Sequence, residues 1–214
     1  TTLDNNEIVR SAKTVVLAVK PQFYEEVLTE VHDSLTTEHT IIGIAPGKTL
    51  AWLEEKAGLP LKVVRFMPNT PAQVGAGMTA VCTNDRVSED ELAEILKITD
   101  SFGCTEVVPE RLMDAAGAVG GCSPAYVFMF IEAMADAAVS QGMPRKQAYK
   151  FASQTVLGSA KMVLETGKHP GELKDMVCSP AGTTIEAVRV LEEKGFRSSV
   201  IEAMKTCEEI SKSM

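Results

Sequence analysis

The sequence contains 214 residues, of which 45% are hydrophobic and 23% are charged, and its formal net charge is −8. A chain of this length can form one large or two small globular domains with a buried core. The acidic balance argues against general affinity for nucleic acids or anionic membranes, because Lys and Arg supply most of the energy of phosphate binding. We therefore expect a small molecule or another protein as the partner.

The cysteines and histidines form neither a metal-binding pattern nor a disulfide framework. Five cysteines are scattered without a C-x-x-C pair, and the spacings of the three histidines do not suit a metal site. Such cysteines are typical of free thiols in a reducing, cytoplasmic compartment. The longest apolar stretch, residues 125–139, is interrupted by Glu132 and Asp136. We expect it to be too short and too charged to span a membrane.

Short β-branched runs alternate with amphipathic helical segments in the first half of the chain. Strands are predicted at residues 14–19, 40–44, 62–66, 78–82 and 105–108. Helices are predicted between them at residues 23–35, 50–57 and 89–102. The near-continuous apolar character of the strands predicts an open parallel sheet with helices on both faces.

Helical patterns replace the β-branched runs after residue 110. Ser123 and Pro124 predict a helix start, with the serine as cap and the proline in the first turn. Gly142 predicts the end of that helix in a left-handed conformation. Further helices are predicted at residues 144–165, just after 170, at 183–194 and at 196–212. The second half of the chain is therefore predicted to be all-helical.

One predicted helix carries a face of small residues that would allow another helix to approach closely. This face belongs to the helix at residues 144–165 and contains Ala152, Gly158, Ser159 and Ala160. Close packing of this kind can serve a bundle core within one subunit or an interface between two subunits. We favour an intertwined dimer, with packing inside the domain as the alternative.

Two candidate binding loops lie where predicted strands end. The first is residues 18–21, at the position where open α/β sheets bind ligands. The second combines residues 44–47 with residues 65–71, where two prolines flank Asn69 and Thr70 in a rigid loop. An ordinary structural turn is the alternative interpretation of both loops.

A third candidate loop, residues 178–186, leads into a helix. Thr183 and Glu186 fit a capping box, and the free N–H groups at a helix start can bind a carboxylate. Capping of the helix alone is the alternative. The chain offers no Ser-His-Asp arrangement, no convincing carboxylate pair and no Walker-type loop. This pattern favours chemistry carried by a cofactor.

Taken together, five segments resemble those of the Δ1-pyrroline-5-carboxylate reductase family. They are residues 17–21, 67–71, 121–126, 179–185 and 191–197, and the resemblance extends over essentially the whole chain. It implies an α/β Rossmann-type dinucleotide-binding domain at residues 1–108, incomplete at its N-terminus. An all-α dimerisation and substrate domain would follow at residues 109–214. The implied reaction is reduction of a five-membered cyclic imine to L-proline by hydride from NADPH or NADH.

The resemblance also implies roles for individual residues. Thr184 would be catalytic, through a hydrogen bond to the ring nitrogen. The cofactor would be bound by Asn5, Ala18, Val19, Lys20, Pro21, Ile44, Ala45, Pro46 and Asn69. The substrate or proline would be bound by Glu110, Ser179, Gly182, Thr183 and Thr184. In this family the substrate loop comes from the partner subunit, which implies a homodimer, and dimers assemble further into a decamer.

Three features depart from the family pattern. No strand with a G-x-G-x-x-G loop precedes Thr14, so we expect roughly 50 to 60 further residues upstream and low activity for a chain that starts at Thr1. Ala181 stands where the family has glycine, so a positive φ there would be strained. Cys122 replaces a serine and weakens a hydrogen bond while preserving size.

Two other functions fit part of the pattern. A related hydroxyacid dehydrogenase would have the same two-domain plan and would use a catalytic lysine, for which Lys161 is the candidate. The loop at residues 179–185 does not fit that class. A non-catalytic helical oligomerisation module would self-associate without binding a dinucleotide. Cofactor titration and turnover of the cyclic imine distinguish these alternatives from the reductase.

Overall fold

The computed structural model describes residues 1–212, which form two compact units. The first unit consists of residues 1–124 together with the end of the chain from Met204, and the second consists of residues 125–203. Within the first unit, Ser211 Oγ donates a hydrogen bond to Asp114 Oδ1 at 3.0 Å, which ties the C-terminal helix to residues near the sheet. The domain boundary between residues 108 and 109 stays a prediction, because contacts alone define these units.

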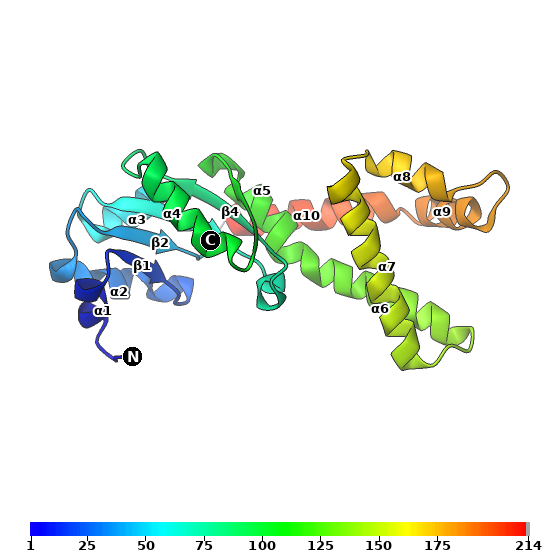
Figure 1. The fold of residues 1–214 in the computed structure, drawn as a ribbon, viewed down its shortest axis with the longest axis horizontal. Helices are drawn as coiled ribbons and strands as arrows, with labels where there is room; N and C mark the ends of the chain where they lie inside the picture. The colour runs from blue at the N-terminus through cyan, green and yellow to red at the C-terminus, as the bar shows by residue number, and fades with distance from the viewer. Residues whose placement is uncertain (213–214) are drawn as a thin grey trace. The chain divides into compact units, whose positions relative to one another are not determined.

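Five strands form one sheet within the described part of the first unit (Figure 1). In order across the sheet they are β1 (Thr14–Leu17), β2 (Thr40–Gly43), β3 (Lys62–Met67), β4 (Gly77–Thr83) and β5 (Gly103–Val107). β1 pairs with β2, β2 with β3, and β4 with β5 in parallel, whereas β3 and β4 are antiparallel.

The prediction of a wholly parallel sheet is wrong at the β3–β4 pair. The connection between these strands contains only a short 3-10 helix, η3 (Thr70–Val74). A parallel pair needs a long crossover, usually a helix, whereas a short connection returns the chain in the opposite direction. The three parallel pairs each have such a crossover, and the structure is therefore a mixed sheet.

The helices of the first unit lie on both faces of the sheet. α2 (Tyr24–Val31) and α3 (Leu50–Ala57) cover one face, while α4 (Glu89–Asp100) covers the other. The 3-10 helices η1 (Pro21–Phe23) and η2 (His32–Ser34) flank α2. The sequence analysis missed α1 (Asn5–Ser11), which Asp4 caps by accepting hydrogen bonds from the backbone N–H groups of Asn6 and Glu7.

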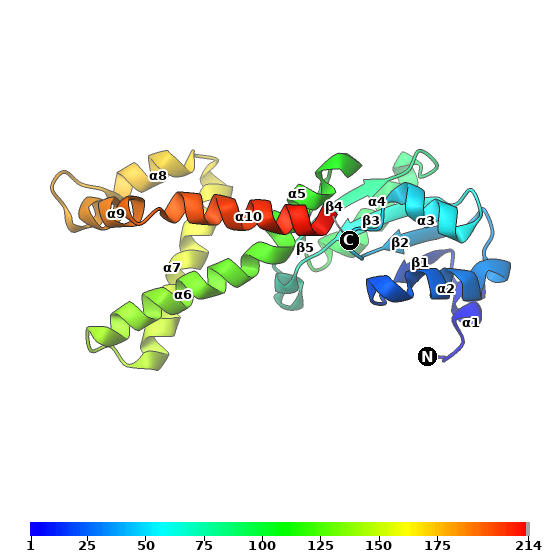
Figure 2. The same cartoon turned by 180° about the vertical axis from the view of Figure 1, so that it is seen from behind.

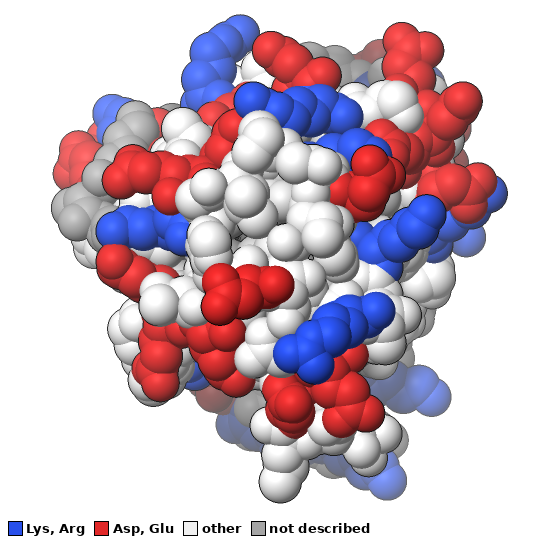
Figure 3. Space-filling view, turned by 90° about the vertical axis from the view of Figure 1, so that its left-hand side faces the viewer, with Lys and Arg blue, Asp and Glu red and all other residues white. Residues whose placement is uncertain are grey.

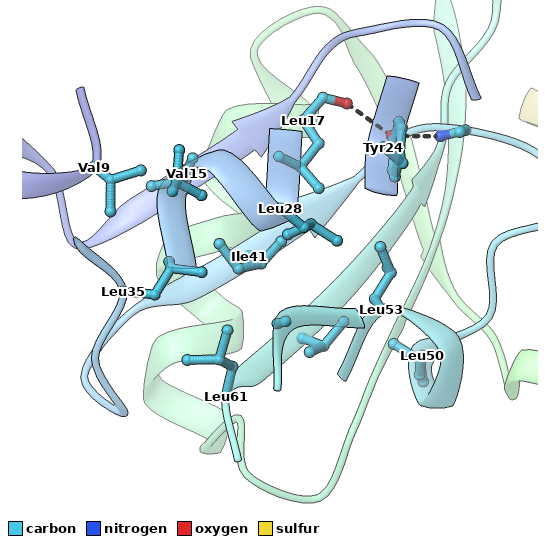
Figure 4. Close-up of a cluster of buried hydrophobic side chains, with 14 of the residues drawn as sticks. Val9, Val15, Leu17, Tyr24, Leu28, Leu35, Ile41, Leu50, Leu53 and Leu61 are labelled. Atoms are coloured by element: carbon cyan, nitrogen blue, oxygen red, sulfur yellow. Dashed lines mark hydrogen bonds between the residues drawn. The ribbon is translucent and has the colours of Figure 1, made fainter. Parts of the chain in front are cut away.

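Alternate residues of the central strands point to the two faces and form two hydrophobic clusters. Ile41 and Val63 belong to the larger cluster, which includes Leu28 of α2 and Leu53 of α3 (Figure 4). On the other face, Ile42, Val64, Phe66 and Val81 pack with Ile95 of α4. Because β2 and β3 are buried on both faces, their apolar side chains stabilise the sheet from both sides.

Helical backbone continues from Glu110 to Ser140. It includes η4 (Glu110–Leu112), α5 (Met113–Ala116), a π-helical segment η5 (Gly117–Cys122) and α6 (Ser123–Ser140). The predicted α-helix does begin at Ser123, but it continues the π-helical segment, so the predicted cap at Ser123 is wrong. Its Oγ does not cap a new helix but donates to the carbonyl oxygen of Ala118 at 3.0 Å.

The segment from Glu110 to Ser140 is long and apolar enough, by length and composition only, to cross a membrane. This corrects the expectation that the apolar stretch is too short, because the helix extends well upstream of residue 125. A single helix of this kind is weak evidence for a membrane span, since core helices of soluble proteins can have the same length and apolar composition. The absence of membrane binding stays a prediction.

Four further helices follow, as predicted from the sequence. They are α7 (Arg145–Thr166), α8 (Pro170–Val177), α9 (Thr183–Glu193) and α10 (Phe196–Lys212) (Figure 2). Gly142, between α6 and α7, has a φ of 97°, which confirms its predicted positive backbone angle. Residues 125–203 thus contain helices and their connections alone.

Acidic and basic side chains are interspersed on the face drawn in Figure 3, around a centre without charged residues. Oppositely charged side chains also form ion pairs: Lys56 pairs with Glu25 at 2.7 Å, and Arg86 pairs with Glu54 at 2.5 Å. Surface pairs of this type add little stability.

The structure does not test the prediction from the acidic net charge that the protein has no general affinity for nucleic acids.

The core packing predicts a large effect of shortening Leu28. Leu28 is fully buried between α2 and the sheet, so Leu28→Ala should lower the free energy of unfolding by about 3 kcal/mol. Val74→Ala is the control, because Val74 is 81% exposed and the change should stay within about 0.5 kcal/mol. Urea unfolding measures both variants. A Leu28→Ala protein as stable as the control would contradict the packing.

Candidate active site

Two candidate loops leave adjacent strands at one edge of the sheet. β1 ends at Leu17 and β2 at Gly43, and these two residues are register partners in the parallel ladder. The loops at residues 18–21 and 44–46 therefore start side by side. This edge, at the carboxyl ends of parallel strands, is where α/β sheets bind ligands.

A buried tyrosine joins the beginnings of both loops. The Tyr24 hydroxyl donates to the carbonyl oxygen of Leu17 at 2.7 Å and accepts from the N–H groups of Ile44 at 2.9 Å and Ala45 at 3.0 Å (Figure 4). Burial raises the pKa of this hydroxyl, so it remains protonated at neutral pH. Tyr24 was not predicted from the sequence, because an aromatic residue on an amphipathic helix has the same pattern as any core residue.

Asn5 lies beside the first loop. A small pocket of about 90 Å³ is lined by Asn5, Ala18 and Val19 together with apolar residues of β1. The Asn5 side-chain amide donates to Glu30 Oε2 at 2.8 Å, which orients it on α1. Three of the residues predicted to bind the cofactor thus share one surface.

The loop residues suit close approach of a dinucleotide. Ala18, Val19 and Lys20 are exposed, Ile44 and Pro46 are half-buried, and Ala45 is buried. Residues 18–21 and 44–46 contain no carboxylate that would repel phosphates, and Lys20 adds a positive charge. The small side chain of Ala18 lets a ligand approach the backbone of the first loop, so the residues present fit a dinucleotide.

Asn69 and Glu110 are both held by the fold. Asn69 Oδ1 accepts the backbone N–H of Met78 at 2.9 Å and so closes the β3–β4 connection. Glu110 Oε1 accepts from Arg65 Nη1 at 2.8 Å and from the backbone N–H of Leu50 at 2.7 Å. Glu110 therefore anchors the first turn of α3 to a buried arginine. Its predicted substrate contact stays a prediction.

Cys82 stands opposite Arg65 in the β3–β4 ladder. Burial raises the pKa of its thiol to about 11, although the nearby Arg65 charge acts in the opposite direction. A thiol with this pKa is protonated at neutral pH. Cys82 is therefore a core residue and not a nucleophile.

The third loop contains a strained residue and a close backbone approach. Ala181 has a φ of 57°, a left-handed backbone angle that is strained for a residue with a Cβ atom. At Gly182, a Cβ atom would lie 2.6 Å from Ser179 Oγ and 3.1 Å from the Ser179 carbonyl oxygen. The Gly182 N–H donates to that carbonyl at 3.0 Å, so the turn is tight.

α9 begins directly after this loop without a side-chain cap. The predicted capping box is wrong: Gly182 occupies the N-cap position, and Glu186 accepts instead from Arg189 Nε at 3.0 Å. Thr183 and Thr184 are the first two residues of the helix, and Thr184 is half-buried. N–H groups at such a helix start are suited to bind an anion.

The second unit exposes a large apolar groove of about 910 Å³. α6, α9 and α10 line it with residues that include Tyr126, Met129, Phe130, Leu191 and Phe196. Other large apolar side chains are also exposed, among them Phe128 at 61%, Phe151 at 64% and Leu164 at 82%. Apolar surface on this scale marks an interface with another protein chain.

Together, these features fit an α/β protein that binds a dinucleotide at its sheet edge and associates with another chain through a helical unit. Comparison with known families agrees and identifies the class as a dinucleotide-dependent oxidoreductase. Residues 110–214 match the family described as pyrroline-5-carboxylate reductase dimerisation, and residues 1–47 match NADP oxidoreductase coenzyme F420-dependent.

Individual relatives cover almost the whole chain. The pyrroline-5-carboxylate reductase of Escherichia coli (strain K12) is 57% identical over 208 residues, which are 97% of this chain and 77% of the relative. That of Methanosarcina acetivorans is 45% identical, over 99% of this chain and 78% of its own length. The crystal structure of Plasmodium falciparum pyrroline carboxylate reductase with NADP bound has a TM-score of 0.92 and 35% identity, covering 99% of this chain and 80% of the other.

The chain belongs to the pyrroline-5-carboxylate reductase family. Membership confirms the family and the fold class inferred from the sequence, namely a Rossmann-type unit followed by a helical dimerisation unit. The roles of the individual site residues stay predictions.

The loop geometry predicts opposite effects for two neighbouring substitutions. Ala181→Gly should raise the free energy of unfolding by about 0.5 to 1 kcal/mol, because relief of left-handed strain exceeds the entropic cost of glycine. Gly182→Ala should lower it, because the new Cβ would meet Ser179. Urea unfolding tests both, and a destabilised Ala181→Gly protein would contradict the strain.

Proposed function

We propose that the protein reduces Δ1-pyrroline-5-carboxylate to L-proline with hydride from NADPH, or from NADH as the alternative donor. Membership in the reductase family is the observation that carries this proposal. The match to an NADP oxidoreductase family over residues 1–47 and the solved relative with NADP bound support the choice of cofactor. The product places the reaction at the end of proline synthesis.

The sheet edge holds the dinucleotide in this proposal. The binding residues are Asn5, Ala18, Val19, Lys20, Pro21, Ile44, Ala45, Pro46 and Asn69. Their support is the shared start of two loops at Leu17 and Gly43, the absence of carboxylates in those loops, and the small pocket beside Asn5. When bound, the nicotinamide supplies the hydride.

The third loop holds the substrate in this proposal. The free N–H groups at the start of α9 bind the substrate carboxylate, with Ser179, Gly182 and Thr183 forming the turn around it. The Thr184 hydroxyl accepts a hydrogen bond from the protonated ring nitrogen and fixes the ring face. Glu110 contributes a carboxylate beside the substrate.

Little acid–base chemistry is required of the protein. The imine accepts hydride at its carbon once its nitrogen is protonated, and the nitrogen keeps that proton in the product. The protein then contributes orientation and exclusion of water. This explains a site built from backbone groups and hydroxyls.

A homodimer is the working unit in this proposal. The dimerisation family match and the apolar groove of the helical unit support self-association. The substrate loop of one subunit completes the site of its partner, and dimers assemble into a decamer. We place the enzyme in the cytoplasm, with the small imine and proline as its ligands.

The full-length protein is expected to oxidise NADPH with the cyclic imine and not with short hydroxyacids or ketoacids. Absorbance at the reduced nicotinamide band follows the reaction. Failure to turn over the imine would reject the proposed function. Turnover of a ketoacid instead would favour the related dehydrogenase class.

Thr184→Ala is expected to lower kcat/KM for the imine by about 10- to 100-fold, because a hydrogen bond to a charged nitrogen is lost. Stability should change little, since Thr184 is only half-buried. Ser140→Ala is the control: it removes an exposed hydroxyl from the end of α6 and should leave turnover unchanged. A Thr184→Ala enzyme with unaltered kinetics would remove this residue from the site.

A further inference from the structure

We propose that Tyr24 is a positioning residue for the dinucleotide, whose hydroxyl holds the ends of β1 and β2 so that two loops form one binding surface. The inference rests on the proposed function, which places the cofactor on residues 18–21 and 44–46. Tyr24 itself contacts the loop backbones and not the reacting atoms.

The hydroxyl satisfies three backbone groups at the point where the ladder stops. The last register pair of β1 and β2 is Leu17 with Gly43. Beyond it, Tyr24 Oη donates to the Leu17 carbonyl and accepts from Ile44 and Ala45. A tyrosine hydroxyl has one donor and two acceptor sites, so its full capacity is used. The hydroxyl therefore bridges the ends of β1 and β2 at the point where direct strand pairing stops.

These backbone groups lie in a part of the fold that is largely closed to solvent. Leu17 is 4% exposed and Ala45 is 6% exposed, so water reaches them poorly. Buried backbone groups need a hydrogen-bond partner, and loss of the hydroxyl would remove one partner from each of these three groups. The first residues of both loops would then shift to find water or each other.

The ring of Tyr24 is fixed by its surroundings. It is fully buried, and its centroid lies 6.5 Å from that of Trp52 on α3. At Gly43, a Cβ would lie 3.6 Å from Tyr24 Cε1 and 2.9 Å from Leu53 Cδ1, so the glycine leaves room for both side chains. A fixed ring on a packed helix gives the hydroxyl a defined position.

The test is Tyr24→Phe, which keeps the ring and removes only the hydroxyl. In the full-length enzyme we expect KM for the dinucleotide to rise about tenfold, while kcat and KM for the imine stay within about twofold. Amide hydrogen exchange at Ile44 and Ala45 should accelerate in the cofactor-free protein. The first readout reports cofactor binding, and the second reports the hydrogen bonds at the start of the second loop.

Leu28→Val is the matched control. It lies on the same helix and in the same cluster, but it makes no polar contact with the loops. It should lower stability and leave KM for the dinucleotide unchanged. An equal rise of KM in this control would show that lost stability accounts for the effect and would overturn the inference.

A second variant covers the case in which Tyr24→Phe does not fold. Gly43→Ala keeps the hydroxyl, but its methyl group would lie 2.9 Å from Leu53 Cδ1, so that Leu53 or the end of β2 must shift beside the Tyr24 ring. The same selective rise of the dinucleotide KM is expected. An active wild-type enzyme with unchanged dinucleotide KM in both variants would overturn the inference alone. A wild-type protein that does not reduce the imine would overturn the proposed function and with it the cofactor role of Tyr24.

Discussion

Burial of β2 and β3 on both faces is the constraint on which the rest of the first unit depends. Helices on each side cover Ile41 and Val63 on one face and Ile42 and Val64 on the other. Ligands therefore reach the sheet at its ends, where loops emerge. At the carboxyl edge the ladder between β1 and β2 stops, and backbone groups need new partners. Tyr24 supplies them from the helix that also fills the core.

The second candidate site, the loop before α9, depends on a helix start without a side-chain cap. Gly182 precedes α9 because any Cβ there would meet Ser179, and Ala181 adopts a left-handed angle to make the turn. Capping by a side chain would occupy the N–H groups that a carboxylate can use. A strained turn is a typical feature of a binding loop. The fold thus provides a carboxyl edge of the sheet that is suited to a dinucleotide and a loop before α9 that is suited to a small acid.

The sequence predicted the regular elements well because their patterns are local. Apolar periodicity located the strands and most helices within a few residues of their observed bounds. The direction of β4 was missed, since it depends on the length of a connection and not on the composition of the strand. Ser123 and Thr183 both carry capping motifs, yet one lies inside a continuing helix and the other one residue past the N-cap.

The candidate sites were only partly predictable, because some of their contacts join segments that are far apart in the sequence. The loops could be located because strand ends and Gly or Pro residues are visible in the sequence. Tyr24 could not, because three backbone groups from two other segments define its role. The pairing of Glu110 with Arg65 and Leu50 likewise joins residues 45 and 60 positions apart. Tertiary contacts of this range leave no signal in a single sequence.

Hydrogen–deuterium exchange of the full-length oligomer, measured with NADP⁺ and with L-proline separately, tests the division of the two sites most directly. We expect NADP⁺ to slow exchange at Ala18, Lys20 and Ala45, and L-proline to slow it at Thr183 and Thr184. Saturating NADP⁺ that leaves the sheet-edge loops unprotected, or proline that protects them in place of the start of α9, would contradict this division of the two sites.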